Sequence, residues 1–149
     1  GTPLRQGGGH SDEVTACAFS PDGRLLASSS KDCTCRVWDV STGECKTIMS
    51  ASEQQIYYCD MSPNGDVLFS CSYNTCTLWD VATGESKFVL GDGGDNSLGY
   101  TNHCSFSPNG ALIATGHSDQ TCRLWNAATG ECVHVLKGHY GGVRSCHFS

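Results

Sequence analysis

The sequence is poor in basic residues and has no long apolar run. It contains nine Lys and Arg against fifteen Asp and Glu, which gives a formal charge of −6 over 149 residues. The few positive charges are scattered. Sequence-independent binding of nucleic acid or of an anionic membrane surface needs clustered Lys and Arg. No apolar run approaches the ~18 residues of a membrane-spanning helix. We therefore expect neither a nucleic-acid partner nor insertion into a membrane.

Several motifs that mark chemical activity are also absent. No C-x-x-C occurs, which counts against a zinc or dithiol redox site. The stretch "GGGH" at 7–10 is not followed by G-K-[ST], so it is no phosphate-binding loop. No serine lies on a G-x-S-x-G elbow of the kind used by hydrolases. We expect no catalytic residue, no metal site and no cofactor.

What the sequence does contain is a repeat. "CAFSPDGRLLASSSKDCTCRVWDVSTGEC" is followed by "CDMSPNGDVLFSCSYNTCTLWDVATGES" and by "CSFSPNGALIATGHSDQTCRLWNAATGEC", and a further copy opens with "CHFS". Trp38, Trp79 and Trp125 lie 41 and 46 residues apart. Periods of this length are typical of solenoids, propellers and related arrays.

The eleven cysteines follow this repeat, which bears on whether they form a metal site, a redox site or a disulfide framework. All except Cys33 and Cys71 occupy repeat positions. Equivalent residues of successive units rarely come within disulfide distance. Cys33 and Cys35 are expected on a strand, where C-x-C is taken to be a poor chelate. The favoured interpretation is a small buried residue in each unit, with the thiols unpaired in a reducing compartment.

Each copy predicts four short antiparallel strands. In the first copy they are expected at 14–19, 24–30, 34–40 and 45–50, where apolar residues partly alternate with polar ones. "PDG" and "PNG" predict hairpin turns, with Gly supplying a positive φ. Four strands per ~40–45 residues describe one blade of a β-propeller.

The pairs Gly9-His10 and Gly138-His139, the turns "FSPDG" and "FSPNG", and the pairs Trp38-Asp39 and Trp79-Asp80 resemble WD40 repeats. The resemblance covers nearly the whole chain. It implies an all-β propeller segment of about three four-stranded blades from a larger ring, with the innermost strand first. The expected units are repeat 1 at about 9–50, repeat 2 at about 51–91, repeat 3 at about 92–137 and a partial repeat 4 at 138–149.

The resemblance also implies a hydrogen-bonded set of His, Ser or Thr, Asp and Trp inside a blade. It is matched by His10, Ser28, Asp32 and Trp38 in repeat 1 and by Thr115, Asp119 and Trp125 in repeat 3. In repeat 3 an insertion displaces any preceding histidine. Repeat 2 is one residue short, offers Asn74 at the aspartate position and has no Gly-His before it. Its network is therefore expected to be weaker, or its turn released for binding.

In this family partners usually bind the wide face near the central channel, so the matching positions are the expected partner-binding residues. They are Glu13, Lys31, Gln55, Tyr58, Tyr73, Tyr100, His103 and Ser118, with Ala16, Gly142 and Ser145 at the corresponding small positions. Tyr58, Tyr73, Tyr100 and His103 are either an interface hot spot or rings that pack on their own blades. The Gly-rich loop 91–100 is either solvated, a partner contact or, through Asp92 and Asp95, a Ca²⁺ site without EF-hand spacing.

Taken together, these features predict a non-enzymatic scaffold or adaptor that binds other proteins or peptides. The alternatives are an enzyme or small-molecule sensor that uses the central channel, and a ligand-sensing regulatory propeller within a larger multidomain signalling protein. We expect an intracellular, cytoplasmic location. Three blades leave bare apolar faces. The remaining blades are expected from a longer chain or, alternatively, from two copies that exchange end strands near Leu4 and at 143–148.

The repeat positions of the cysteines generate a test. Protein isolated without added oxidant and then denatured should present about eleven reactive groups to a thiol reagent, since the thiols are expected to be unpaired. A markedly lower count that a reductant restores would show that disulfides are present.

Overall fold

The structure is a computed structural model that describes residues 9–50, 54–73, 75–90 and 101–149. These residues form twelve β-strands and no helix. The strands build three four-stranded antiparallel sheets, each ordered as in the chain. We name them sheet 1, sheet 2 and sheet 3. The all-β fold class is confirmed, and the part of the chain described here has no helical segment able to cross a membrane.

The strands lie close to their predicted positions. Sheet 1 consists of β1 (Val14–Phe19), β2 (Leu25–Ser30), β3 (Thr34–Asp39) and β4 (Cys45–Ser50). Sheet 2 consists of β5 (Ile56–Met61), β6 (Val67–Ser72), β7 (Cys76–Asp80) and β8 (Ser86–Leu90). Sheet 3 consists of β9 (Thr101–Phe106), β10 (Leu112–His117), β11 (Cys122–Asn126) and β12 (Cys132–Leu136).

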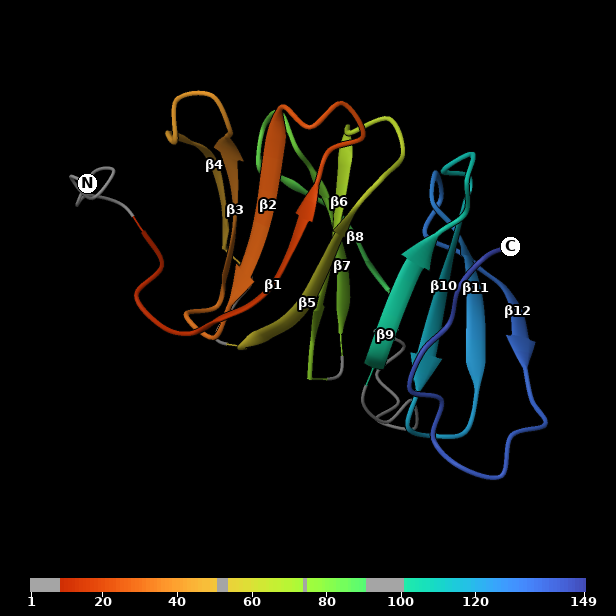
Figure 1. The fold of residues 1–149 in the computed structure, drawn as a ribbon. Helices are drawn as coiled ribbons and strands as arrows, with labels where there is room; N and C mark the ends of the chain where they lie inside the picture. The colour runs from red at the N-terminus through yellow and green to blue at the C-terminus, as the bar shows by residue number, and fades with distance from the viewer. Residues whose placement is uncertain (1–8, 51–53, 74, 91–100) are drawn as a thin grey trace.

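Glycine closes the first hairpin of each sheet as the sequence predicts. Gly23, Gly65 and Gly110 have φ of 72°, 78° and 72°, a region that costs glycine little. The three sheets follow one another in chain order without closing a ring, and β1 packs against β5 and β5 against β9 (Figure 1). We call β1, β5 and β9 the inner strands.

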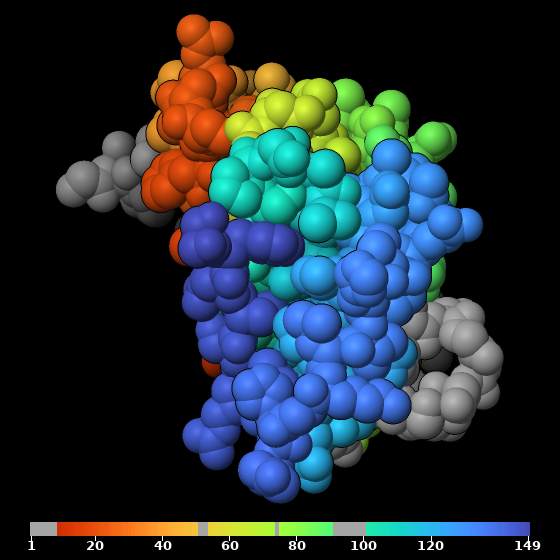
Figure 2. All heavy atoms as spheres, turned by 90° about the vertical axis from the view of Figure 1, so that its right-hand side faces the viewer, coloured from red at the N-terminus to blue at the C-terminus, as the bar shows by residue number. Residues whose placement is uncertain are grey.

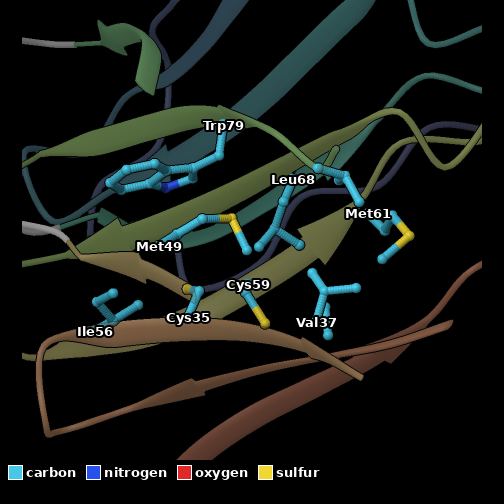
Figure 3. Packing of buried hydrophobic residues seen from close by; sticks show 10 residues of the cluster. Cys35, Val37, Met49, Ile56, Cys59, Met61, Leu68 and Trp79 are labelled. Atoms are coloured by element: carbon cyan, nitrogen blue, oxygen red, sulfur yellow. The ribbon is translucent and has the colours of Figure 1, made fainter. Parts of the chain in front are cut away.

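The apolar core lies between neighbouring sheets. Cys35, Val37 and Met49 of sheet 1 meet Cys59, Met61, Leu68 and Trp79 of sheet 2 in one cluster (Figure 3). A second cluster joins sheets 2 and 3 and contains Phe69, Leu78, Leu90, Ile113 and Trp125. Burying one side chain of the size of Leu68 contributes about 1.5–3 kcal/mol. Each sheet is therefore stable only with a neighbour on its apolar face.

In sheet 1 a chain of hydrogen bonds connects all four side chains of the expected set. Trp38 Nε1 donates to Ser28 Oγ at 2.9 Å, Ser28 Oγ lies 2.6 Å from His10 Nε2, and His10 Nδ1 lies 2.9 Å from Asp32 Oδ2. An indole N–H only donates, so the Ser28 hydroxyl donates to Nε2 and the histidine proton on Nδ1 goes to the carboxylate. Burial alone would raise the pKa of Asp32, but hydrogen bonds from Thr34, His10 and Ser11 lower it well below the usual value.

Sheet 3 has the same chain of tryptophan, hydroxyl and histidine, but its histidine comes from a different position of the repeat. Trp125 Nε1 donates to Thr115 Oγ1 at 2.8 Å, and Thr115 Oγ1 lies 2.7 Å from Nε2 of His117. The histidine that the insertion displaces is thus replaced by one on β10, only two residues after the threonine. Burial lowers the pKa of His117 to about 4. Asp119 binds Thr121 and Arg123 instead of joining this chain through a hydrogen bond.

In sheet 2 the chain of hydrogen bonds is shorter. Trp79 Nε1 donates to Ser70 Oγ at 2.8 Å, and the Ser70 hydroxyl helps to lower the pKa of the Cys35 thiol of sheet 1, which other causes raise. Ser72 Oγ lies 2.6 Å from Thr75 Oγ1 and 2.9 Å from Gln54 Oε1. Asn74, expected at the aspartate position, lies outside the described residues.

Two sequence expectations are wrong. Cys33 lies in a turn with φ 71°, not in a strand, because this turn needs a left-handed residue before β3, as Gln120 (φ 72°) provides before β11. Residues 143–148 form no strand. They are held by sheet 3 instead, through Val143 N–H to His117 O at 2.8 Å and Asn102 Nδ2 to Val143 O at 2.9 Å. The candidate outer strand near Leu4 lies outside the described residues.

Despite this, segment 143–148 sits on sheet 3 as β5 sits on sheet 1. Thr15 Oγ1 donates to Ile56 O at 2.7 Å, which is the same contact between repeat positions as Asn102 to Val143. A Cβ at Gly116 would lie 2.8 Å from Val143 Cγ1, so only glycine permits this approach.

The two ends of the row of sheets are open. Cys17 on β1 is exposed, whereas its equivalents Cys59 and Cys104 are 1% and 0% exposed. At the other end Leu136 on β12 is 48% exposed, whereas its equivalents Met49 and Leu90 are 0% and 2% exposed. Figure 2 shows this second face, made by sheet 3 and the C-terminal segment. Cys17 and Leu136 thus occupy repeat positions that are buried in the neighbouring sheets, and they are exposed here because no further sheet covers them.

A buried neutral histidine makes sheet 3 sensitive to acid. As pH falls below the ordinary histidine pKa of about 6.5, the unfolded chain binds a proton that folded His117 takes up only near pH 4. Stability should therefore fall by up to about 3 kcal/mol over this window and then level off. Thermal unfolding of full-length protein carrying His117→Gln should lose this part of the pH dependence.

The parent protein, measured over the same pH range, is the reference for this test. A His117→Gln profile that parallels the parent between pH 6.5 and 4 would contradict the assignment.

The open faces predict the behaviour of these 149 residues alone. Apolar faces of this size rarely stay in water on a monomer. The isolated chain should sediment as an oligomer or aggregate and should not unfold cooperatively as a monomer. A monodisperse, cooperatively folded monomer at micromolar concentration would show that no further blade is needed.

Candidate functional site

Side chains from successive repeats form an aromatic column along the inner strands. The ring centroids of Tyr58 on β5 and His103 on β9 lie 5.0 Å apart, and those of His103 and His147 lie 4.8 Å apart. Tyr58 and His103 are equivalent repeat positions, while His147 comes from the C-terminal segment. We call Tyr58, His103 and His147 the inner-strand column. Tyr58 and His103 are half-buried and His147 is exposed, and such rings have the amphipathic character of interface anchors.

Polar contacts fix the column. The Cys146 N–H donates to His103 Nδ1 at 3.3 Å, and Ser145 Oγ lies 2.9 Å from His147 Nε2. Burial, and secondarily the nearby His147, lowers the pKa of His103. Burial likewise raises the pKa of the Tyr58 hydroxyl. Both groups are therefore neutral at pH 7, which suits a surface that packs rings against a partner.

A carboxyl that the sequence analysis did not select belongs to the same surface. Asp60 lies two residues after Tyr58 on β5, so both side chains share one face of the strand. Burial raises the pKa of Asp60, although the backbone N–H of Met61 donates to it. Asp60 directly follows Cys59, as His147 directly follows the equivalent Cys146. The alternation of side chains along the inner strand could therefore have identified both residues from the sequence.

The other expected residues lie at the edge where inner strands begin and second strands end, the lower edge in Figure 1. We call this edge the rim. Glu13 and Lys31 form an ion pair of 2.8 Å there. Gln55 accepts a hydrogen bond from Tyr57 Oη at 3.2 Å, and Tyr73 is 52% exposed in the β6–β7 turn.

On sheet 3, a Cβ on Gly142 would lie 3.2 Å from the Cα of Ser118, so these two backbones touch. Of the four predicted hot-spot residues, the structure brings Tyr58 and His103 together and leaves Tyr73 on the rim. Tyr100 lies outside the described residues, as do Asp92 and Asp95 of loop 91–100. In the described ranges no group of three or more His, Cys, Asp or Glu is placed to hold a metal ion.

Ser28, His10 and Asp32 have the order of a catalytic triad but not its chemistry. Ser28 is buried, and its oxygen already accepts the Trp38 indole N–H at 2.9 Å. A nucleophile must instead reach a substrate carbon next to donors for the developing oxyanion. The trio ties strands together from within the sheet, and the geometry favours a structural role.

A groove of about 590 Å³ lies between sheets 1 and 2, away from the inner-strand column. Two lysines and two aspartates line it together with Leu25 and Val81. Thr47 Oγ1 bridges the two sheets there by donating to Val81 O at 3.0 Å. Its mixed charge selects no ligand class, so the inner-strand column and the rim are the stronger candidate surface.

Comparison with known proteins agrees with this architecture. A family model described as "WD domain, G-beta repeat" matches residues 1–39, 43–80, 93–126 and 130–149. Pre-mRNA-processing factor 19 of Bos taurus is 31% identical over 141 residues, which are 94% of this chain and 28% of that protein. WD repeat-containing protein VIP3 of Arabidopsis thaliana is 29% identical over 157 residues, 98% of this chain and 49% of that protein.

A shorter stretch is similar to U3 small nucleolar RNA-associated protein 21 of Saccharomyces cerevisiae, with 43% identity over 67 residues, 44% of this chain and 7% of that protein. The chain thus spans 28% of the length of pre-mRNA-processing factor 19 and 49% of that of VIP3.

The histidines of the column generate a test by NMR titration of the full-length protein. His103 should protonate below the ordinary histidine pKa, because burial and the neighbouring His147 both disfavour its charged form. His147→Ala removes the neighbour and should raise the pKa of His103. His139→Ala, at a residue that precedes segment 143–148, should leave the pKa of His103 unchanged. An unchanged pKa of His103 in His147→Ala would show that the two rings are not coupled.

Proposed function

Since the chain belongs to the WD40 repeat family, we propose that it acts as a non-enzymatic scaffold or adaptor that holds other proteins or peptides on the inner-strand column and the rim. The observation that supports this most is the column itself. Three rings from three repeats lie in contact, with tilted planes and neighbouring centroids 5.0 Å and 4.8 Å apart, and each comes from a position where the repeat tolerates other residues. The network residues, by contrast, are used to hold the sheets.

The expected partner is a protein surface or peptide with apolar groups flanked by hydrogen-bond donors. The neutral rings of Tyr58 and His103 offer apolar contact, and Glu13 and Lys31 at the rim offer one charge of each sign. Tyrosine and other aromatics are typical anchors at protein interfaces. The position of Tyr73 in an exposed turn beside this surface extends the area available to a partner.

Protein is proposed over nucleic acid on electrostatic grounds. Two relatives carry names that refer to pre-mRNA processing and to a small nucleolar RNA. This chain has a net charge of −6, which repels a phosphate backbone. If the protein works in an RNA-containing assembly, we propose that it binds the protein components of that assembly and not the RNA.

We propose an intracellular location from the eleven free thiols, which persist in reducing compartments. The relatives' names give no support to the cytoplasm in particular. Further blades are proposed to cover the open faces of sheets 1 and 3. Their source is a longer chain or, alternatively, a second copy.

Tyr58→Ala in the full-length protein should weaken a partner recovered by pull-down by about 2 kcal/mol, or about thirtyfold in Kd, because a central aromatic anchor is lost. Tyr58 is half-buried, so Tyr73→Ala, on an exposed ring, is the companion variant that leaves the fold intact. Val89→Ala on the outer strand β8 is the control. Unchanged binding of every partner in both tyrosine variants would exclude this surface.

A further inference from the structure

Three cysteine thiols meet between sheets 2 and 3. Cys71 on β6 and Cys76 on β7 have their Sγ atoms 3.8 Å apart, and Cys104 on β9 belongs to the same buried cluster. All three are buried, at 1%, 3% and 0% exposure. The Cys76 thiol also lies 3.4 Å from Thr101 Oγ1. This cluster has no part in the proposed partner surface.

The backbone places Cys71 and Cys76 where a cross-strand disulfide fits. They are direct partners in the β6–β7 ladder, and the adjacent Ser72 N–H donates to Thr75 O at 2.9 Å. Hydrogen-bonded and non-hydrogen-bonded pairs alternate along an antiparallel ladder, so Cys71 and Cys76 form a non-hydrogen-bonded pair with Cα atoms about 4.5 Å apart. Disulfides span Cα distances from about 4.4 Å upward.

The repeat does not require two thiols on this rung. The equivalent pair is Ser29 and Cys35 in sheet 1, and Gly116 and Cys122 in sheet 3. Sheet 2 alone, among the three described sheets, has cysteine on both strands. Cys71 is also one of the two cysteines that fall outside the repeat positions.

We propose that Cys71 and Cys76 form a redox modification site, which a low-molecular-weight disulfide such as oxidised glutathione converts into a cross-strand disulfide. One thiol loses its proton and attacks a sulfur of the oxidant, forming a mixed disulfide and releasing one glutathione thiolate. The second cysteine, as thiolate, then displaces the remaining glutathione. Two protein thiols lose two electrons and two protons, and the oxidant becomes two glutathione thiols.

Burial controls the rate of this step. It raises the pKa of both thiols well above the usual value, so the reactive thiolate is scarce in the closed hairpin. The pair lies on the rung next to a turn that carries the exposed Tyr73, and opening of this end gives the oxidant access. The exposed Cys132 should therefore react first, as a mixed disulfide, and the pair should react later, with both members oxidised together.

The test uses folded full-length protein in glutathione buffers of rising oxidised fraction, with tryptophan fluorescence to verify that the fold persists. Free thiols are alkylated, and peptides are mapped by mass spectrometry before and after reduction. The expected product is a peptide linkage between Cys71 and Cys76 that is lighter by two hydrogens. Cys71→Ser, the residue that sheet 1 has on this rung, should abolish the linkage.

Two control variants separate the pair from its surroundings. Cys33→Ser, in a turn of sheet 1, and Cys104→Ser, which leaves the hairpin intact, should both preserve the linkage. The proposal is overturned if Cys71 and Cys76 stay reduced while the fold persists, if each ends as a separate glutathione adduct, or if Cys71 is linked to Cys104.

Discussion

Each sheet of this protein can bury its apolar face only against the next sheet, and the other features follow from this constraint. The two core clusters lie between sheets and not within one. The same contact brings Tyr58 against His103 at the inner strands. Where the covering sheet is missing, positions that are otherwise buried are exposed, as Cys17 and Leu136 are. Stability and surface are thus properties of the interface between repeats more than of one repeat.

The period of the sequence predicted what is internal to a repeat. Strand positions, glycine turns and the Trp38–Ser28 bond depend on residues within about twenty positions of one another, and these recur in each copy. His117 was missed because the histidine expected from the sequence precedes the repeat. His117 instead lies on β10, the strand that also carries its hydrogen-bond partner Thr115. The partial alternation and the turn residues favoured strands throughout.

Contacts between repeats were harder to predict, because the period does not give the register of one sheet against the next. The thiols show this. The expectation that equivalent cysteines stay apart did not cover cysteines at different repeat positions. Cys35 on the third strand of sheet 1 and Cys59 on the first strand of sheet 2 belong to one buried cluster, and they lie near each other in Figure 3. Cys122 and Cys146 are the corresponding pair between sheet 3 and segment 143–148, and the two thiols interact there. Segment 143–148 was similarly predicted as a strand from its sequence, although its contacts are with sheet 3 alone in the described ranges.

Sheet 2 shows how a repeat can change without losing its place in the row. Its tryptophan keeps the hydroxyl partner Ser70, but no hydrogen bond from Ser70 to a histidine is found among the described residues, whereas the other two sheets have one. Cys71 and Cys76 lie one rung inside Ser72 and Thr75, near the turn end of the hairpin. The neighbouring sheets supply the packing that this sheet's own network lacks, through Met49 on one side and Ile113 on the other. A repeat covered on both faces is the one that can vary its internal bonds, and the unusual residues of this chain, Tyr58, Tyr73 and Cys71, are accordingly found there.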